Sequence, residues 1–171
     1  MAEKLVIISD MWGATKGYLQ QYYDIEFYDC QQLGNIDVVI SSEENVHKAF
    51  VNGGIETAVR NLLRKEKSPA HYLAFSMGGT IAYKAALKGL PMKSLTALSS
   101  TRIRLEKEKP ITDLNLIFGE RDEFRPNDDW QQAVGADVTV IPNFGHHLYS
   151  DEKIISEVCL ELLEKVTKKA V

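Results

Sequence analysis

Cysteine is scarce in this sequence of 171 residues, which contains only Cys30 and Cys159. The two lie far apart and form neither a metal-binding nor a redox pair. A disulfide framework is therefore excluded, and so few cysteines favour a reducing intracellular compartment. A chain of this length can bury a substantial core without disulfides or metals, so we expect one domain spanning residues 1–171.

Long apolar runs and excess positive charge are also missing. The first apolar run, residues 5–8, stops at Ser9 and Asp10, well short of a secretory signal. No segment approaches the roughly 20 apolar residues of a membrane-spanning helix. The formal net charge of -4 gives no support for general nucleic-acid binding. We therefore expect a soluble, cytoplasmic protein that does not insert into membranes or bind nucleic acid.

Repeats, low-complexity segments and a glycine-rich phosphate loop are absent as well. The loop that follows residues 5–8 holds a single glycine, Gly13, whereas nucleotide-binding loops need several glycines at fixed spacing. This composition argues against a doubly wound nucleotide-binding protein.

The sequence does contain short apolar runs that alternate with helical patterns. Strands are predicted at 5–8, 25–28, 71–74, 95–98, 114–118 and 138–141, and the run 38–40 is either a strand or an irregular lead into the next helix. Helices are predicted at 16–23, around 55–65, after residue 76, at 128–134 and around 155–166. Gly89 and Pro91 are predicted to end the helix that follows residue 76. This alternation favours an α/β fold with a parallel sheet covered by helices on both faces. The strands then end at one common edge, where chemistry is expected.

The most informative stretch is 74–79, Ala-Phe-Ser-Met-Gly-Gly, between a predicted strand and a helix rich in small residues. A serine at such a corner, with small residues two positions before and after it, is typical of a nucleophile elbow. The turn is sharp, so larger side chains at Ala74 or Gly78 would collide. Ala74 replaces the usual first glycine. Ser-x-Gly-Gly also occurs in ordinary βα turns, where the serine only caps the helix.

Polar residues follow two later strands. The strand at 114–118 leads into Gly-Glu-Arg-Asp, which ends at Asp122, and the strand at 138–141 leads into Pro-Asn-Phe-Gly-His-His, which contains His146. The chain order is therefore Ser, Asp, His at one sheet edge, unlike the two other common serine triads. A serine needs a base to take its proton as it attacks, and a carboxylate holds the imidazole in the required tautomer.

With these three motifs the chain resembles the α/β-hydrolase family over nearly its whole length. The resemblance implies a three-layer α/β/α sandwich with a mostly parallel central sheet. It also implies that Ser76 is the nucleophile, His146 the base and Asp122 the acid that orients the base.

The neighbouring histidine is the main alternative for the base. The family usually places the base directly after glycine, so His146 is preferred to His147. No Asp, Glu, His or Cys set with metal-ligand spacing accompanies this pair, so no metal is expected. The two remaining histidines are assigned structural roles: His47 and His71.

For the acid, the alternatives are Glu120 and Glu123. The family's Gly-x-x-Asp spacing favours Asp122. Some members place the acid after the preceding strand, but residues 99–101 read Ser-Ser-Thr here and hold no carboxylate, which also favours Asp122.

The resemblance further implies an oxyanion hole made by the amide of Met77 and an amide after the first strand. Many relatives carry His-Gly and then an apolar donor in that loop. Here Asp10 and Met11 stand in the His-Gly positions, so Trp12 is the donor by alignment, and Met11 is the alternative. An acid beside a developing oxyanion is unexpected, so Asp10 should point away and brace the loop by accepting backbone amides.

Larger relatives insert a helical lid after the strand at 95–98, whereas this chain has only the loop 101–111. We therefore expect a minimal fold with no cap domain and a site open on one side. The loop contains Arg102 and Arg104, which we hypothesise to bind a carboxylate or phosphate of the substrate. The competing interpretation is that nearby glutamates pair with these arginines: Glu106, Glu108, Glu120 and Glu123.

The resulting hypothesis is a serine hydrolase that cleaves an ester or thioester through an acyl-serine intermediate, without a cofactor. Its substrate would be a small molecule or a carrier-bound acyl group, with an anionic feature as a further hypothesis. The Phe-Ser-Met-Gly-Gly string is similar to that of lidded esterases that release pimeloyl esters from acyl carrier protein, but the missing lid argues against that identity. A non-catalytic binding module on a hydrolase scaffold is the alternative, suggested by Ala74 and the Asp10-Met11 pair.

Overall fold

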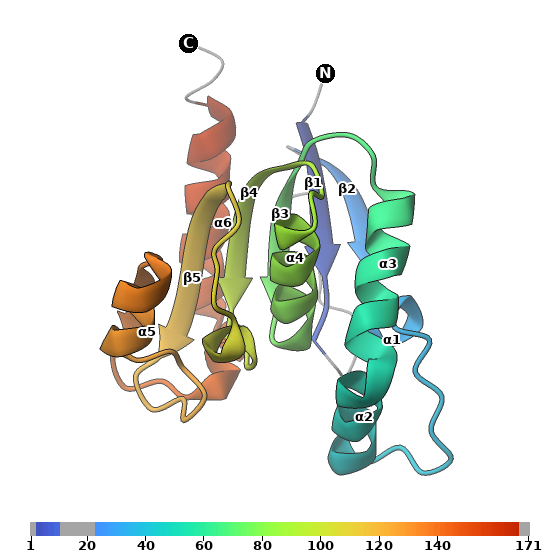
Figure 1. The fold of residues 1–171 in the computed structure, drawn as a ribbon. Helices are drawn as coiled ribbons and strands as arrows, with labels where there is room; N and C mark the ends of the chain where they lie inside the picture. Colours follow the sequence, from blue (N-terminus) through green and yellow to red (C-terminus); the bar gives the residue numbers. More distant parts are fainter. Residues whose placement is uncertain (1–2, 11–22, 168–171) are drawn as a thin grey trace.

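The computed structural model describes residues 3–10 and 23–167. Its centre is a six-stranded sheet in the order β2-β1-β3-β4-β5-β6, in which every neighbouring pair is parallel. The strands are β1 (Glu3–Ile8), β2 (Tyr23–Tyr28), β3 (Ala70–Phe75), β4 (Met92–Leu98), β5 (Asp113–Gly119) and β6 (Val138–Ile141). Figure 1 shows the arrowheads of the labelled strands at one end of the sheet, which is therefore its carboxyl edge.

Successive strand residues point to opposite faces of the sheet, and this alternation divides the core in two. Val6 and Tyr72 belong to the core on one face, and Leu5 and Leu73 to the core on the other. The first core is covered by α1 (Cys30–Leu33), α2 (Glu43–Ala49), α3 (Ile55–Lys65), α4 (Met77–Leu87) and α5 (Asp128–Val134). The second is covered by α6 (Glu152–Thr167) and the 3-10 segment η3 (His146–Ser150). Figure 1 shows α3 and α4 in front of the sheet and α6 behind it. The predicted three-layer α/β/α fold with a parallel sheet is confirmed.

The junction of β3 and α4 is packed so closely that side chains are excluded after the serine. Strand β3 is buried along its whole length, as expected for a central strand with helices on both faces. A Cβ atom on Gly78 would lie 2.3 Å from the carbonyl oxygen of Ser9, and one on Gly79 would lie 1.8 Å from the Ser100 Oγ. The two glycines therefore let the start of α4 approach the carboxyl ends of β1 and β4.

Helix α4 ends in the way that the sequence predicts. Gly89 has a φ of 96°, which a side chain would strain, and its amide donates to the Ala86 carbonyl at 3.1 Å. The amide of Leu90 donates to the Ala85 carbonyl at 3.0 Å. These two bonds form a Schellman motif, which satisfies the last carbonyls of the helix.

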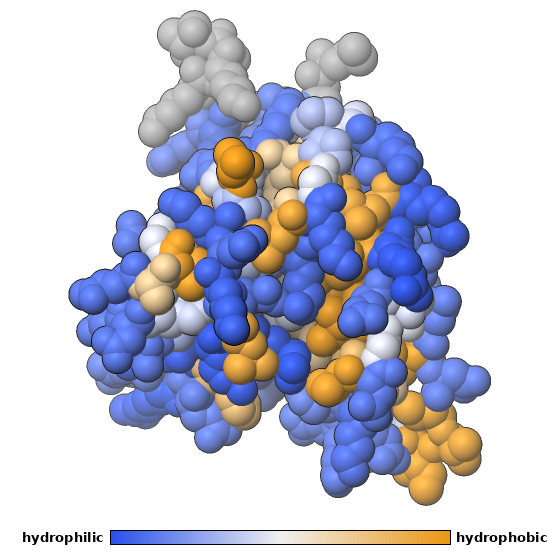
Figure 2. Space-filling model, viewed as in Figure 1, coloured by the Kyte–Doolittle hydropathy of each residue, from blue (hydrophilic) through white to orange (hydrophobic). Residues whose placement is uncertain are grey.

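The strand-like run at 38–40 is not a strand. Val39 and Ile40 are exposed, whereas Val38 packs against the core. The Asn45 side chain donates to the Ile40 carbonyl at 2.9 Å just as α2 begins, so the chain follows the predicted alternative, an irregular lead into a helix. Figure 2 shows exposed apolar surface at this corner of the molecule, beside α2. The predicted helix at 16–23 lies outside the described residues, except for Tyr23, which begins β2.

Between β4 and β5 there is no cap domain. The segment that joins these strands contains only a 3-10 turn, η2 (Ile103–Leu105). The residues that follow η2 are hydrogen-bonded to helices α4 and α5. The Tyr83 hydroxyl donates to the Glu108 carbonyl at 2.5 Å, and Trp130 Nε1 donates to the Glu106 carbonyl at 2.9 Å. Lys84 also pairs with the Glu106 carboxylate at 2.5 Å. Among the described helices, none is both long and apolar enough to cross a membrane.

Candidate active site

Ser76 occupies the corner between β3 and α4 in a strained conformation. Its φ is 50° and its ψ is -119°, a region that residues with a side chain rarely adopt. The side chain makes no capping bond to α4. Instead, its Oγ lies 3.1 Å from Nε2 of His146. The alternative of an ordinary capped turn is therefore wrong, and the corner has the geometry of a nucleophile elbow.

His146 begins η3, directly after the loop that follows β6, and it lies between Ser76 and Asp122. Its Nδ1 is 3.3 Å from Oδ2 of Asp122. An ionised carboxylate can only accept hydrogen bonds, so Nδ1 carries the proton and Nε2 is left to accept from the Ser76 hydroxyl. His147 is exposed and stands outside this hydrogen-bonded chain.

Asp122 is buried just past the carboxyl end of β5, and its charge is compensated locally. Burial alone would raise its pKa. Three influences lower the pKa and together outweigh burial: the hydrogen bond from His146, the hydrogen bond from the Phe124 amide to Oδ1 at 3.0 Å, and the charge of Arg104. The pKa of Asp122 is therefore below its ordinary value, and the group is ionised at neutral pH.

The two competing carboxylates lie elsewhere in the acid loop. Glu120 and Glu123 are both exposed. The Glu120 Oε1 accepts the backbone amide of Asn143 at 3.2 Å, so this side chain holds the histidine loop. The structure thus brings Asp122, and neither glutamate, to the imidazole of His146.

The acid and histidine loops are joined by backbone contacts that fix their relative position. The Arg121 amide donates to the Phe144 carbonyl at 2.9 Å. A Cβ atom on Gly119 would lie 2.3 Å from the same carbonyl oxygen, so only glycine allows this approach. These backbone contacts fix the distance between the two loops independently of the side-chain bonds.

Ser99 is a site residue that the sequence analysis missed. It follows β4 with a φ of 56°, and its Oγ donates to the carbonyl oxygen of His146 at 2.6 Å. The available signal was its place after β4, where some α/β hydrolases carry the acid. Without a carboxylate there, the position held no obvious role in the sequence.

The predicted oxyanion hole is described only in part. As the first residue of α4, Met77 has a backbone N–H with no acceptor within the helix. Trp12 and Met11 lie outside the described residues. The Asp10 carboxylate was expected to accept backbone amides. In the structure it accepts a hydrogen bond from the Tyr149 hydroxyl at 3.0 Å, which the sequence did not predict.

Comparison with solved structures shows which fold surrounds this site. The mouse alpha/beta hydrolase domain-containing protein 10 matches with a TM-score of 0.65 at 12% identity, over 96% of this chain and 90% of that one. A predicted CIB-like hydrolase from Thermoplasma acidophilum matches with a TM-score of 0.64 at 14% identity, over 95% and 86% of the two chains. Est1E from Butyrivibrio proteoclasticus with bound ferulic acid matches at 0.62 and 13% identity, over 96% and 89%.

This chain has the α/β-hydrolase fold. No protein-family model and no curated protein sequence matches it, so the likeness is one of structure. One fold hosts many activities, so the residues of the site, and not the fold, determine the activity of this chain.

The arginines at the rim of the candidate site are not neutralised by the glutamates around them. Within the described ranges, no arginine forms an ion pair. The Arg104 guanidinium lies 5.0 Å from the centre of the Phe124 ring and donates to the Thr101 carbonyl. The partly exposed Arg102 has no side-chain hydrogen bond to any described residue. The competing interpretation of arginines paired with glutamates is therefore wrong for this part of the chain.

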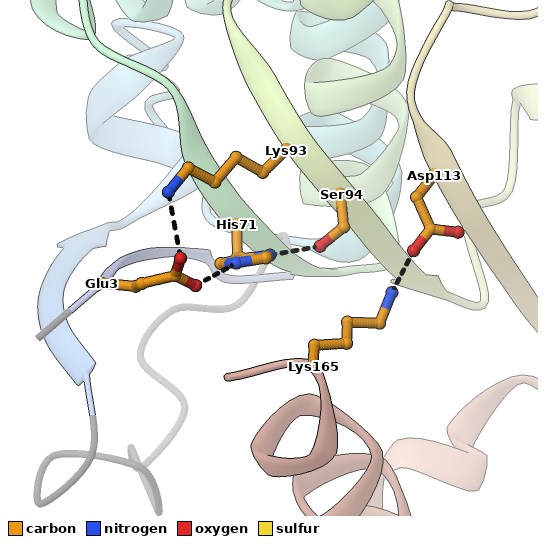
Figure 3. Close-up of polar contacts among 6 residues, drawn as sticks. All are labelled: Glu3, His71, Lys93, Ser94, Asp113 and Lys165. Carbon is orange, nitrogen blue, oxygen red and sulfur yellow. Dashed lines mark hydrogen bonds and ion pairs between the residues drawn. The ribbon is translucent and has the colours of Figure 1, made fainter. Parts of the chain in front are cut away.

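A second set of serine, histidine and carboxylate lies at the opposite edge of the α/β-hydrolase sheet (Figure 3). His71 contacts the Ser94 Oγ at 2.8 Å and the Glu3 carboxylate at 2.6 Å, and Lys93 pairs with the same carboxylate at 3.2 Å. His71 and Ser94 are both buried, so no substrate can reach this hydroxyl. The set joins the amino ends of β1, β3 and β4 and is structural, whereas Figure 3 shows Asp113 and Lys165 joining β5 to α6.

This structural set predicts a pH dependence of stability. Burial raises the pKa of Glu3, but the hydrogen bond with His71 and the pairing with Lys93 lower it by a larger amount. The pKa in the folded state therefore lies below the ordinary 4.5. The stabilisation is complete above pH 4.5 and is lost as the pH falls through the lower folded value. Glu3→Gln should therefore lower the unfolding free energy by about 1 kcal/mol at pH 7 and by less at pH 3.

Thermal unfolding between pH 3 and pH 7 checks this expectation. Glu157→Gln, a change at an exposed glutamate on α6, is the matched control and should show no such convergence. An equal loss for Glu3→Gln at both pH values would contradict the assignment.

The remaining predicted features concern metals and His47. Among the described residues, no three His, Cys, Asp or Glu side chains are grouped to hold a metal ion. His47 is partly exposed on the polar helix α2 and is distant in sequence from Ser76, Asp122 and His146.

Proposed function

We propose that this protein is a serine hydrolase that cleaves a carboxylic ester or thioester through an acyl-serine intermediate. The observation that supports it most is the contact of 3.1 Å between the Ser76 hydroxyl and Nε2 of His146, whose Nδ1 lies 3.3 Å from the buried Asp122. Ser76 itself lies in the strained turn between β3 and α4. The names of the structural neighbours, which include hydrolases and Est1E with bound ferulic acid, support the same class.

In the proposed reaction the Ser76 Oγ attacks the substrate carbonyl while His146 Nε2 takes its proton. The Met77 amide, with Trp12 or Met11 as second donor, would hold the oxyanion of the tetrahedral intermediate. The proton then passes from His146 to the leaving alcohol or thiol, which departs and leaves the acyl-serine. A water molecule loses its proton to His146, attacks the acyl carbon and releases the acid, and the proton returns to Ser76. Each step balances without a cofactor.

The rim of the site supports a proposal about the substrate. No cap domain lies between β4 and β5, so we propose that the edge that carries Ser76 admits a bulky small molecule or a carrier-bound acyl group. Arg102 and Arg104 lie in the loop over this edge, and no glutamate neutralises them, so we place an anionic group of the substrate there. Arg102→Gln should raise KM for an acidic ester about tenfold and leave a neutral ester of equal length unchanged. Equal KM changes for both esters would remove this part of the proposal.

A fluorophosphonate probe tests the proposed reaction directly, because it phosphonylates only an activated serine. The wild-type protein should gain one adduct, located by peptide mass spectrometry on Ser76, and Ser76→Ala should gain none. Ser94→Ala is the matched control: its hydroxyl also contacts a histidine, but it is buried, so labelling should be unchanged. Absence of an adduct on the wild type would favour the alternative, a non-catalytic binding module on this scaffold.

A further inference from the structure

Tyr149 contacts two residues at the candidate relay formed by Ser76, His146 and Asp122: His146 itself and Phe75, the neighbour of Ser76. It lies in η3, three residues after His146, and its ring stands edge-on to that imidazole with centroids 5.9 Å apart and an interplanar angle of 86°. The same ring packs on Phe75, the residue before Ser76, at 5.6 Å. Tyr149 is therefore placed to fix the imidazole relative to the serine.

The hydroxyl of Tyr149 is held by a residue from the far end of the chain. It donates to the Asp10 Oδ2 at 3.0 Å, across 139 positions of sequence. Burial, and next the nearby Asp10 carboxylate, raise the pKa of this phenol, so it remains a neutral donor.

Asp10 is itself anchored to the carboxyl end of β1. Its carbonyl accepts from the Cys30 Sγ at 2.6 Å and from the Ser9 Oγ at 3.0 Å. The amide of Ser9 donates to the Tyr28 carbonyl of β2 at 3.0 Å. Asp10 is thus a fixed point on the sheet to which Tyr149 is tied.

The other contacts of His146 leave its ring orientation weakly determined. The bond from Nδ1 to Asp122 is long, at 3.3 Å, and the bond from Ser99 holds the backbone carbonyl, not the ring. The His147 ring also contacts the imidazole, with centroids 5.2 Å apart, but it is exposed to solvent. The partly buried Tyr149 ring, whose hydroxyl is bound to Asp10, is therefore the neighbour best placed to limit rotation of the imidazole away from Ser76.

We propose that Asp10 and Tyr149 are positioning residues for the base: Asp10 holds the Tyr149 hydroxyl, and the Tyr149 ring holds the His146 imidazole within reach of Ser76. This inference rests on the proposed hydrolase function. It gives the unusual acid after β1 a role that depends on accepting a hydrogen bond, not on its charge. A small displacement of a base from its nucleophile is costly, because proton transfer requires close alignment.

The test compares three single variants and one double variant on p-nitrophenyl acetate. Tyr149→Phe keeps the ring and removes the hydroxyl, so kcat should fall about tenfold at all pH values while KM stays within about twofold. Asp10→Ala should lose the same factor. Asp10→Asn keeps an acceptor oxygen and should retain kcat within about twofold. Because the two residues act through one bond, the double variant Asp10→Ala with Tyr149→Phe should be no slower than either single variant.

Active-site titration with the fluorophosphonate counts folded, competent protein in each variant, so a loss of stability cannot imitate the loss of kcat. A Tyr149→Phe variant with wild-type kcat per titrated site would overturn the proposal. Equal losses in Asp10→Asn and Asp10→Ala would overturn it as well, because the charge would then be what matters. After either of these results, the proposed hydrolase function still stands if the wild-type protein is labelled and active. If the wild-type protein is not labelled, the hydrolase proposal and the positioning proposal both fail. Should Tyr149→Phe not fold, the contrast of Asp10→Asn with Asp10→Ala decides alone.

Discussion

Replacing His146 by alanine is expected to lower kcat for an activated ester such as p-nitrophenyl acetate by about 10⁵-fold or more. Among the described residues, the imidazole is the only side chain that hydrogen-bonds to the Ser76 hydroxyl, so without it we expect the nucleophile to return to the reactivity of an ordinary alcohol. KM should change little, because the ring contributes to proton transfer and not to holding the ester. Steady-state kinetics, corrected for spontaneous hydrolysis, measures this loss.

Two further variants make the result specific to the relay. His147→Ala removes the adjacent, exposed imidazole and should leave kcat within about twofold. The double variant Ser76→Ala with His146→Ala should be no slower than either single variant, since serine and base act as one unit. If His147→Ala shows the large loss instead, or if the double variant falls far below both singles, the proposed relay is wrong.

The parts of this fold that the sequence predicted are those encoded by local patterns. The buried runs of β1, β3 and β5 are short and apolar, and the glycine end of α4 obeys a local backbone rule, so each was predicted within a few residues. The meeting of Ser76, Asp122 and His146 also followed from simple topology, because all parallel strands end at one edge. The run 38–40 remained ambiguous because only the position of neighbouring elements decides whether three apolar residues gain a strand partner.

The parts that the sequence did not predict are contacts between side chains remote in the chain. The bond from Ser99 to the carbonyl of His146 depends on how closely the turn after β4 approaches η3. The bond from Tyr149 to Asp10 joins the ends of the sequence, and no local pattern distinguishes it from an exposed tyrosine. Such bonds are set by tertiary geometry, so the sequence could name the candidate reacting groups but not the residues that contact them.

The carboxylate of Asp122 carries the second large expected effect. Asp122→Asn should lower kcat by about 10³–10⁴-fold with little change in KM. The amide can turn its NH₂ group toward Nδ1 of His146, and this favours the tautomer whose Nε2 carries the proton and cannot accept one from Ser76. It also leaves the imidazolium formed during reaction without a compensating charge.

The pH dependence of that loss separates orientation from simple titration of the acid. The pKa of Asp122 is held below its ordinary value of 3.8, so the wild-type carboxylate is charged throughout the range above about pH 5. Titration of this carboxylate should therefore add no transition to the wild-type pH profile above about pH 5, and the loss in Asp122→Asn should persist across that range. Glu123→Gln is the matched control, since it removes an exposed carboxylate one residue away and should leave activity unchanged. A large loss in Glu123→Gln, with Asp122→Asn nearly active, would assign the acid to the wrong residue of this loop.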